Sequence, residues 1–231
     1  MYKVIAISDV HLGLKHAKTK ELIEFLKTHP TELLILNGDI IDEWAIRKNF
    51  GKNIALLRYL LTLNKSNHTR VVWTYGNHDE TFEHLVDLTI NNIEIKKDFI
   101  IDVFGRKYFV FHGHAIDIFA TKKYKWISRM GAMAYEMLVS LNHLVNKLGF
   151  NTHFSKKIKE RSKKTTNANF SRDAVDLAIK NNCTGVICGH VHIPKDEMIR
   201  GVRYLNSGDW VENQSAILID KFGRVSIYNK K

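Results

Sequence analysis

Five short stretches of this chain carry aspartate, asparagine and histidine, side chains that bind divalent metal ions in many enzymes. The stretches are Asp9-Val10-His11, Gly38-Asp39, Gly76-Asn77-His78-Asp79, His112-Gly113-His114 and Gly189-His190-Val191-His192. Imidazole nitrogens and carboxylate or amide oxygens are borderline-to-hard ligands, and no cysteine joins them, so the set favours Mn, Fe, Zn or Mg. Together the stretches predict a centre that holds two divalent metal ions and hydrolyses a phosphorus–oxygen bond.

Each stretch follows a short apolar run that is rich in β-branched or aromatic residues. The runs are residues 4–7, 33–36, 71–73, 108–111 and 185–188. Short, nearly continuous apolar runs are typical of strands that are buried on both faces of a sheet. Helical patterns lie between several of them, at residues 20–28, 54–63 and 174–181. Strands that alternate with helices predict an α/β domain.

The place of the polar stretches, directly after the strands, predicts that they meet in space. In open α/β sheets ligands bind beyond the carboxyl ends of the strands. Two metals close together need a shared carboxylate, and Asp39 is the natural bridge. We expect the remaining ligands to divide into Asp9, His11 and His192 for one metal, and Asn77, His112 and His190 for the other.

His190 and His192 pose a geometric condition on this division. They are two residues apart, so in an extended segment their side chains would point to opposite sides. They can serve two neighbouring metals only if the chain turns at Gly189 or after it.

The order of these polar residues resembles the motifs of the calcineurin-like metallophosphoesterases. The matching positions are Asp9, His11, Asp39, Asn77, His78, Asp79, His112, His190 and His192. The resemblance covers most of the chain and implies a two-sheet sandwich, mostly parallel or mixed, flanked by helices. It also implies a dinuclear metal-dependent hydrolase in which a hydroxide between the metals attacks phosphorus.

The same resemblance gives two residues roles other than metal binding. His78 is similar to the family histidine beside the leaving group, which acts as an acid or stabilises charge. Asp79 is the expected partner that orients it. Two interpretations of Asp42 stay open, a carboxylate that orients a histidine or the N-cap of a helix.

Length and composition predict one domain that spans residues 1–231. Hydrophobic residues make up 45% of the chain, which is enough for a core. The first residues run directly into a strand, so we expect no signal peptide, and no apolar stretch approaches the ~20 residues of a membrane-spanning helix. We interpret Cys183 and Cys188 as reduced core residues of a cytoplasmic protein.

Positive charge is concentrated in one segment. The net charge is +11, and residues 121–164 hold eleven lysine and arginine residues against two glutamates. Methionine and leucine residues between Met130 and Leu148 recur at spacings of three and four, as on an amphipathic helix. The segment lies between the predicted ligands His112 and His190. We therefore expect a helical insertion at residues 118–165 that acts as a lid over the metal site.

Such an insertion suits several partners. It could simply pack on the core with a solvated basic face, or bind nucleic acid, or bind an anionic membrane surface. The basic residues flank an apolar, methionine-rich stripe, which favours a lipid-like anion with acyl tails. Nucleic acid stays open as the alternative, with a phosphodiesterase or nuclease activity. A scaffold without catalysis on the same fold is a third possibility.

Four segments resemble one branch of the superfamily, the UDP-2,3-diacylglucosamine pyrophosphatases. They are residues 38–44, the insertion with Ala134-Tyr135-Glu136 and Leu141-Asn142, residues 189–192, and residues 207–212. The resemblance implies cleavage of UDP-2,3-diacylglucosamine to UMP and 2,3-diacylglucosamine 1-phosphate in lipid A biosynthesis. It also implies two Mn ions and a peripheral position on the inner membrane.

Two positions depart from that branch. Its best-known members have arginine where this chain has His78, and the branch commonly has aspartate where this chain has His114. We expect substrate contacts from four residues, His114, Asp117, Lys163 and Lys164. Two interpretations of the run Ser207-Gly208-Asp209 stay open, a part of the branch motif or a plain turn between strands.

Overall fold

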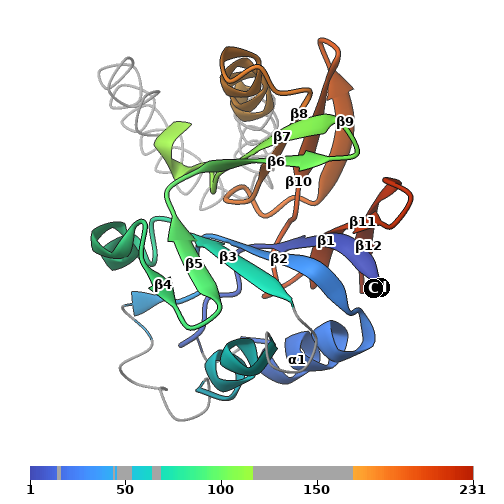
Figure 1. The fold of residues 1–231 in the computed structure, drawn as a ribbon. Helices are drawn as coiled ribbons and strands as arrows, with labels where there is room; N and C mark the ends of the chain where they lie inside the picture. The colour runs from blue at the N-terminus through green and yellow to red at the C-terminus, as the bar shows by residue number, and fades with distance from the viewer. Residues whose placement is uncertain (15–16, 44, 46–53, 64–68, 117–168, 231) are drawn as a thin grey trace, which may run out of the picture. The chain divides into compact units, whose positions relative to one another are not determined.

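The computed structural model describes all residues except 15–16, 44, 46–53, 64–68, 117–168 and 231 (Figure 1). The chain divides into two compact units, one made of Met1–His114 with Ala174–Lys231 and the other of Ala115–Asp173. The sheets and the predicted metal ligands belong to the first unit. The expected insertion at residues 118–165 lies outside the described residues, as do Asp117, Lys163 and Lys164.

Two mixed sheets build the first unit (Figure 1). The strands of one are β1 (Tyr2–Ile7), β2 (Thr31–Asn37), β3 (Arg70–Thr74), β4 (Thr89–Ile90), β5 (Ile93–Lys96), β11 (Ser215–Asp220) and β12 (Val225–Asn229). The strands of the other are β6 (Phe99–Val103), β7 (Arg106–Val110), β8 (Gly185–Cys188), β9 (Lys195–Ile199) and β10 (Val202–Asn206). The strand orders are β12-β11-β1-β2-β3-β5-β4 and β6-β7-β8-β10-β9.

The strands that carry the five polar stretches run parallel within each sheet. β1, β2, β3 and β5 pair in parallel register, and so do β7, β8 and β10. Antiparallel strands complete both sheets, as where β11 pairs with β1 and β9 with β10. The architecture confirms the predicted fold class, an α/β fold of two mixed sheets with flanking helices.

Strand β1 shows why the predicted strands have continuous apolar sequences. Val4 and Ala6 join a buried cluster that also holds Ile187 and Leu205 of the other sheet. The alternate side chains of β1 join a second buried cluster on the opposite face. Burial on both faces favours the uniformly apolar run from Val4 to Ile7. Strand β9 carries no such apolar run, because all of its residues are exposed or only half-buried.

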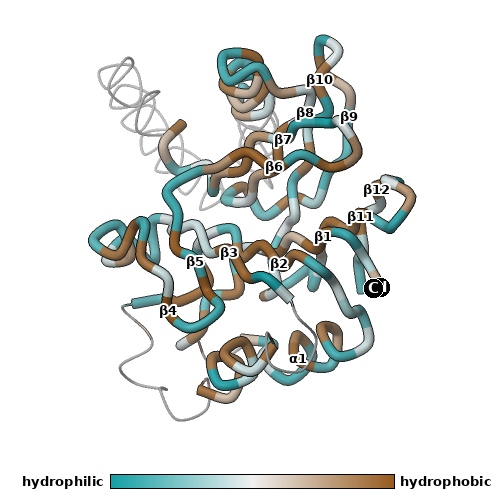
Figure 2. Tube along the Cα trace, in the orientation of Figure 1, coloured by the Kyte–Doolittle hydropathy of each residue, from teal (hydrophilic) through white to brown (hydrophobic). Residues whose placement is uncertain are grey.

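Helices cover the outer face of the seven-stranded sheet. Helix α1 (Thr19–Thr28) buries Leu22, Phe25 and Leu26, spaced by three and one, in the cluster of that face. Figure 2 shows the apolar strands at the centre of the unit and the mixed polar and apolar course of α1. Residues 54–63 and 169–180 are also helical, so all three predicted helical patterns are confirmed. A short 3-10 helix, η1 (Glu80–Leu85), follows the third polar stretch.

Two further observations concern whole-chain expectations. Within the described part of the chain, no helix has the length and apolar character needed to span a membrane. Cys183 and Cys188 are both free and buried, in agreement with reduced core residues. Burial raises the pKa of the Cys188 thiol to about 12.

Candidate metal centre

The five polar stretches meet where β1, β2, β3, β7 and β8 end. Their loops are tied to one another by backbone hydrogen bonds. The N–H of Asp9 donates to the carbonyl of Gly38 at 3.1 Å, and the N–H of Gly189 donates to the carbonyl of His112 at 2.9 Å. Chain segments that are far apart in sequence therefore form one continuous shell around the predicted ligands.

The backbone of this shell is strained. Five of the predicted ligands have left-handed φ angles, between 49° and 70°: Asp9, His11, Asp39, His190 and His192. A non-glycine residue in this region costs on the order of 1–3 kcal/mol and persists only where its surroundings hold it. Such strain clusters at functional sites, and here it aims five side chains at a common centre.

Close approach also explains two glycines of the motifs. A Cβ at Gly76 would lie 2.2 Å from Oδ1 of Asp39, and a Cβ at Gly189 would lie 2.6 Å from Oδ2 of Asp9. Both distances are far below van der Waals contact. Only glycine lets the chain pass this close to the two carboxylates.

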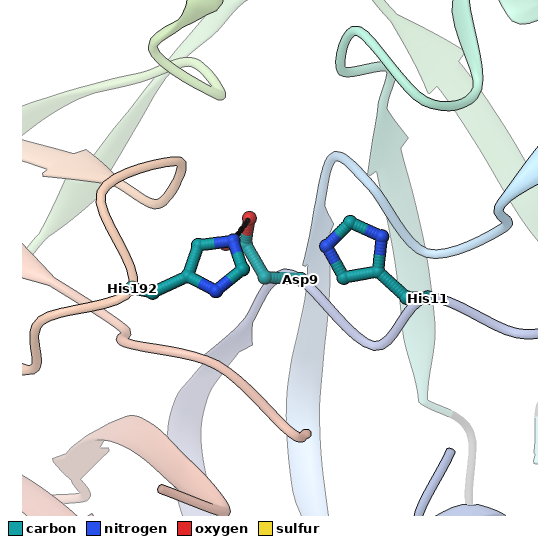
Figure 3. Close-up of side chains that lie close together, drawn as sticks. All are labelled: Asp9, His11 and His192. Atoms are coloured by element: carbon teal, nitrogen blue, oxygen red, sulfur yellow. Dashed lines mark ion pairs between the residues drawn. The ribbon is translucent and has the colours of Figure 1, made fainter. Parts of the chain in front are cut away.

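The first ligand group consists of Asp9, His11 and His192, whose ligand atoms lie within 4.8 Å of one another. Nε2 of His192 is 3.1 Å from Oδ1 of Asp9. Figure 3 shows Asp9 between the two imidazoles, with the Asp9–His192 ion pair drawn as a dashed line. The structure thus brings together the set that the sequence predicted for one metal.

The second ligand group consists of Asp39, His112 and His190, again within 4.8 Å of one another. Nδ1 of His112 lies 2.8 Å from the backbone carbonyl of Asn37. Since a carbonyl can only accept, His112 donates from Nδ1, which leaves Nε2 free to bind a metal. Nε2 of His112 lies 3.3 Å from Oδ2 of Asp39. The sequence did not identify Asn37, the last residue of β2, because its contact with His112 uses the backbone carbonyl, which every residue possesses.

Asp39 links the two groups. It also forms a triad with His11 of the first group and with His78, within the same distance limit. Among the described triads, Asp39 is the only carboxylate that lies close to histidines of both groups, as a bridging carboxylate must. Asn77 is exposed on the turn between Gly76 and His78, and its predicted metal contact stays a prediction.

The electrostatics of the groups fit divalent cations. Burial alone would raise the pKa of Asp39, but the close contact with the imidazole of His112 lowers it well below its usual range. Burial would likewise raise the pKa of Asp9, and His192 lowers it. Nε2 of His11, although buried, has no hydrogen-bond partner within the described ranges. A pair of divalent metal ions would neutralise the two buried carboxylates, and it would give the imidazole nitrogen of His11 a partner.

His78 is held by a carboxylate other than the expected one. Its Nδ1 lies 3.2 Å from Oδ2 of Asp42, and its side chain is 41% exposed. The other oxygen of Asp42 accepts a hydrogen bond from the N–H of Ala45 at 2.9 Å. Both open interpretations of Asp42 therefore apply, since it orients a histidine and also caps the following turn.

The structure corrects the prediction that Asp79 orients His78. The Asp79 carboxylate is fully buried and accepts the backbone N–H groups of Gly76 at 2.6 Å, Ile40 at 2.9 Å and Asp39 at 3.1 Å. The indole of Trp73 donates to it at 3.3 Å. Burial raises the pKa of Asp79. Asp79 fastens the loops after β2 and β3 to each other, so it acts on the site through the backbone.

His114 lies beside the second ligand group. Its ring centroid is 5.6 Å from that of His112 and 5.7 Å from that of Tyr75. Burial, followed by the positive charges of His112 and His190, lowers the pKa of His114 to about 4, so its imidazole is neutral at physiological pH. Its Nδ1 has no hydrogen-bond partner within the described part of the chain.

Comparison with known proteins identifies a family. The family model described as calcineurin-like phosphoesterase matches residues 2–194. No curated protein matches the chain. Similar solved structures include a novel archaeal phosphodiesterase, with 17% identity, 98% of this chain and 99% of that chain covered, and a TM-score of 0.49. Another is the phosphoesterase Yfce of E. coli, with 14% identity, 97% of each chain covered and a TM-score of 0.47. A third is zinc-complexed Vps29 from Entamoeba histolytica, with 12% identity, 98% of this chain and 97% of that chain covered, and a TM-score of 0.41.

Proposed function

We propose, since this chain belongs to the calcineurin-like phosphoesterase family and is a metal-dependent phosphoesterase, that its two ligand groups hold two divalent ions which share Asp39. The first group, Asp9, His11 and His192, would hold one ion. The second, His112 and His190 with Asn77, would hold the other. The single observation that carries this assignment is the position of Asp39 in triads with ligands of both groups.

Bound metals supply two effects in such a site, an acidified water molecule as nucleophile and positive charge for the phosphoryl oxygens. The protein positions the metal ligands through hydrogen bonds from residues that lie behind them. The carbonyl of Asn37 holds the imidazole of His112, and the carboxylate of Asp79 anchors the loop that carries Asp39. These contacts reduce the motion of ligands whose backbone is already strained.

His78 is the proposed acid. Asp42 accepts a hydrogen bond from Nδ1, which leaves Nε2 as the end that can carry a proton to the leaving oxygen or interact with its charge. The side chain is partly exposed, so a substrate can reach it. In this assignment Asp42 takes the orienting role that the sequence had predicted for Asp79.

The substrate that we propose is UDP-2,3-diacylglucosamine, cleaved to UMP and 2,3-diacylglucosamine 1-phosphate in lipid A biosynthesis. Support comes from the sequence resemblance at residues 38–44 and 207–212 and from the basic, apolar-striped segment at residues 121–164. Mn is the proposed metal. We place the protein in the cytoplasm, peripheral on the anionic inner-membrane surface, where such a lipid lies.

The proposed substrate contacts have different support. His114, with its neutral ring beside the second ligand group, offers a hydrogen bond to a substrate oxygen. Asp117, Lys163 and Lys164 are proposed from the sequence resemblance alone. The net charge of +11 also favours a second candidate, a phosphodiesterase or nuclease that acts on nucleic acid or cyclic nucleotides.

A Mn-supplemented assay tests the proposal. The protein is offered UDP-2,3-diacylglucosamine beside a generic diester, bis-p-nitrophenyl phosphate, with and without prior removal of metal. Metal-dependent release of UMP supports the lipid-linked substrate. Hydrolysis of the generic diester alone would contradict the lipid-linked substrate and would still agree with the phosphoesterase activity of the family. Tight, salt-sensitive binding of RNA or DNA would favour the second candidate.

Two controls sharpen the test. The exposed His84 on η1 offers a matched substitution, since His84→Ala removes a histidine outside the site and should leave turnover unchanged. Deletion of residues 122–164 tests the membrane partner. Liposome binding that survived this deletion would contradict the proposed lid.

A further inference from the structure

His190 and His192 enter different ligand groups although only one residue separates them. The N–H of Val191 donates to the carbonyl of Gly189 at 2.8 Å, which closes a three-residue turn about His190 with φ of 70°. A γ-turn with positive φ is rare and strained. His192 follows with φ of 57°. Two strained residues within three positions require contacts from outside the segment to hold them.

One such contact comes from Asn206, the last residue of β10. Its side chain is fully buried, and its Nδ2 donates to the carbonyl of Gly189 at 2.7 Å. This is the same carbonyl that closes the turn about His190. The Asn206 Oδ1 accepts the N–H of Gly208 at 2.9 Å, which fixes the orientation of the amide. Asn206 therefore holds the turn that aims His190.

A second contact comes from Asn213. Its Nδ2 donates to the backbone carbonyl of His192 at 3.0 Å. Asn213 is itself held by the buried Asp209, whose carboxylate accepts hydrogen bonds from both the backbone N–H and the side-chain amide of Asn213. Asp209 also accepts the N–H of Val211 at 2.8 Å. The segment after β10 thus holds His192 through a hydrogen bond that is separate from the one that holds the turn about His190.

We propose that Asn206 and Asn213 are positioning residues that direct His190 to the second ligand group and His192 to the first. The inference rests on the proposed two-metal site. It gives residues 207–209 a role beyond that of a turn between strands, because they connect Asn206 to the segment that holds Asn213.

The test measures the affinity of each metal site separately. Metal-free wild-type protein, Asn213→Ala and Asn206→Asp are titrated with Mn²⁺ by calorimetry. Outer contacts of this kind typically change metal affinity by about 10–100-fold, so each variant should weaken one site by that factor and leave the other within about twofold. The site that weakens is assigned with His192→Ala and His190→Ala. Asn213→Ala should match the former and Asn206→Asp the latter.

A matched control is Asn181→Ala. Asn181 makes the same kind of bond, from Nδ2 to the carbonyl of Leu177 at 2.9 Å, after the helical residues 169–180. It should bind both Mn²⁺ ions as wild type does. Electron paramagnetic resonance gives a second readout, since loss of one ion from a close Mn pair removes the exchange-coupled signal.

Several outcomes would overturn the proposal. One is equal weakening of both sites in each Asn variant, and another is no greater effect than that of Asn181→Ala. Binding of a single Mn²⁺ by wild type would also overturn it. If Asn206→Asp fails to fold, Asn213→Ala decides alone, because Asn213 is only half-buried. Two bound Mn²⁺ ions with no release of UMP would refute the proposed substrate and leave the two positioning roles intact.

Discussion

Asp42 and Asp79 offer the sharpest test of how the site is organised. Asp42 contacts the ring of His78, while Asp79 accepts hydrogen bonds from four backbone N–H groups and an indole. Substitution of each by asparagine keeps the size of the side chain and removes the charge. Asp42→Asn should therefore impair turnover with little loss of stability, and Asp79→Asn should do the reverse.

The structure sets the size of each effect. In Asp79→Asn one amide nitrogen must face backbone donors, so about two of the five hydrogen bonds are lost. Hydrogen bonds to a charged acceptor contribute about 1.5–3 kcal/mol each. Relief from burying a charge offsets part of this loss. We expect the free energy of unfolding to fall by about 2–4 kcal/mol, or roughly 2–4 °C in Tm for each kcal/mol.

The expected loss in Asp42→Asn is kinetic. Acid catalysis contributes about 10²–10⁴-fold to the rate. The kcat of Asp42→Asn should therefore fall by a factor within that range, and it should stay at or above the kcat of His78→Ala. The free energy of unfolding should change by less than about 1 kcal/mol, because asparagine keeps the size of the side chain and its amide oxygen still accepts the N–H of Ala45.

Three measurements decide the matter. Urea unfolding of the metal-free proteins avoids stabilisation by bound metal. Turnover with bis-p-nitrophenyl phosphate and Mn gives kcat, and elemental analysis gives the metal content. The reasoning would be refuted if Asp79→Asn lost kcat at unchanged stability while Asp42→Asn kept full turnover. That result would restore Asp79 as the partner of His78.

The remaining predictions concern four residues. His78→Ala should keep both metals and lose about 10²–10⁴-fold in kcat, whereas Asp39→Ala should lose metal. Equal metal loss in both, by elemental analysis, would contradict these roles. Gly76→Ala brings a Cβ to 2.2 Å from Oδ1 of Asp39, so Mn²⁺ titration should show affinity at least about tenfold weaker, and unchanged affinity would disprove the steric argument. The Cys188 thiol has its pKa raised to about 12 from the ordinary 9.0. Because the pKa of Cys188 is higher in the folded than in the unfolded protein, the stability that the neutral thiol contributes is complete below pH 9. It is lost as pH rises towards 12. In urea titrations, the free energy of unfolding of Cys188→Ala should therefore fall less steeply with rising alkaline pH than that of the wild type. An unchanged slope would contradict this prediction.

Much of the fold could be predicted because burial leaves a mark on sequence. The five apolar runs lie in β1, β2, β3, β7 and β8, because burial on both faces favours apolar residues at these positions. Helix α1 was visible from its apolar spacing. Strands such as β9 were not predicted, because their residues are exposed and their pairing partners, rather than their composition, make them strands.

The ligand residues could also be predicted, since chemistry restricts their types. Aspartate, asparagine and histidine at strand ends are informative because few structural needs place them there together. Their partners could not be predicted in the same way. Asn37 acts through its backbone carbonyl, which every residue possesses. Asn206 and Asn213 act from a segment more than ten residues beyond the histidines that they hold.

The sequence by itself determined the α/β class, the strand ends that carry the site and the ligand types that favour a metal-dependent phosphoesterase. Only the tertiary structure decided which carboxylate faces which histidine. His78 and Asp79 are neighbours in sequence, yet a sharp turn sends the Asp79 carboxylate inward to backbone N–H groups and leaves the ring of His78 beside Asp42. Adjacency along a chain says little about such contacts, because side-chain direction depends on backbone turns and on the unpaired polar groups that folding brings within reach.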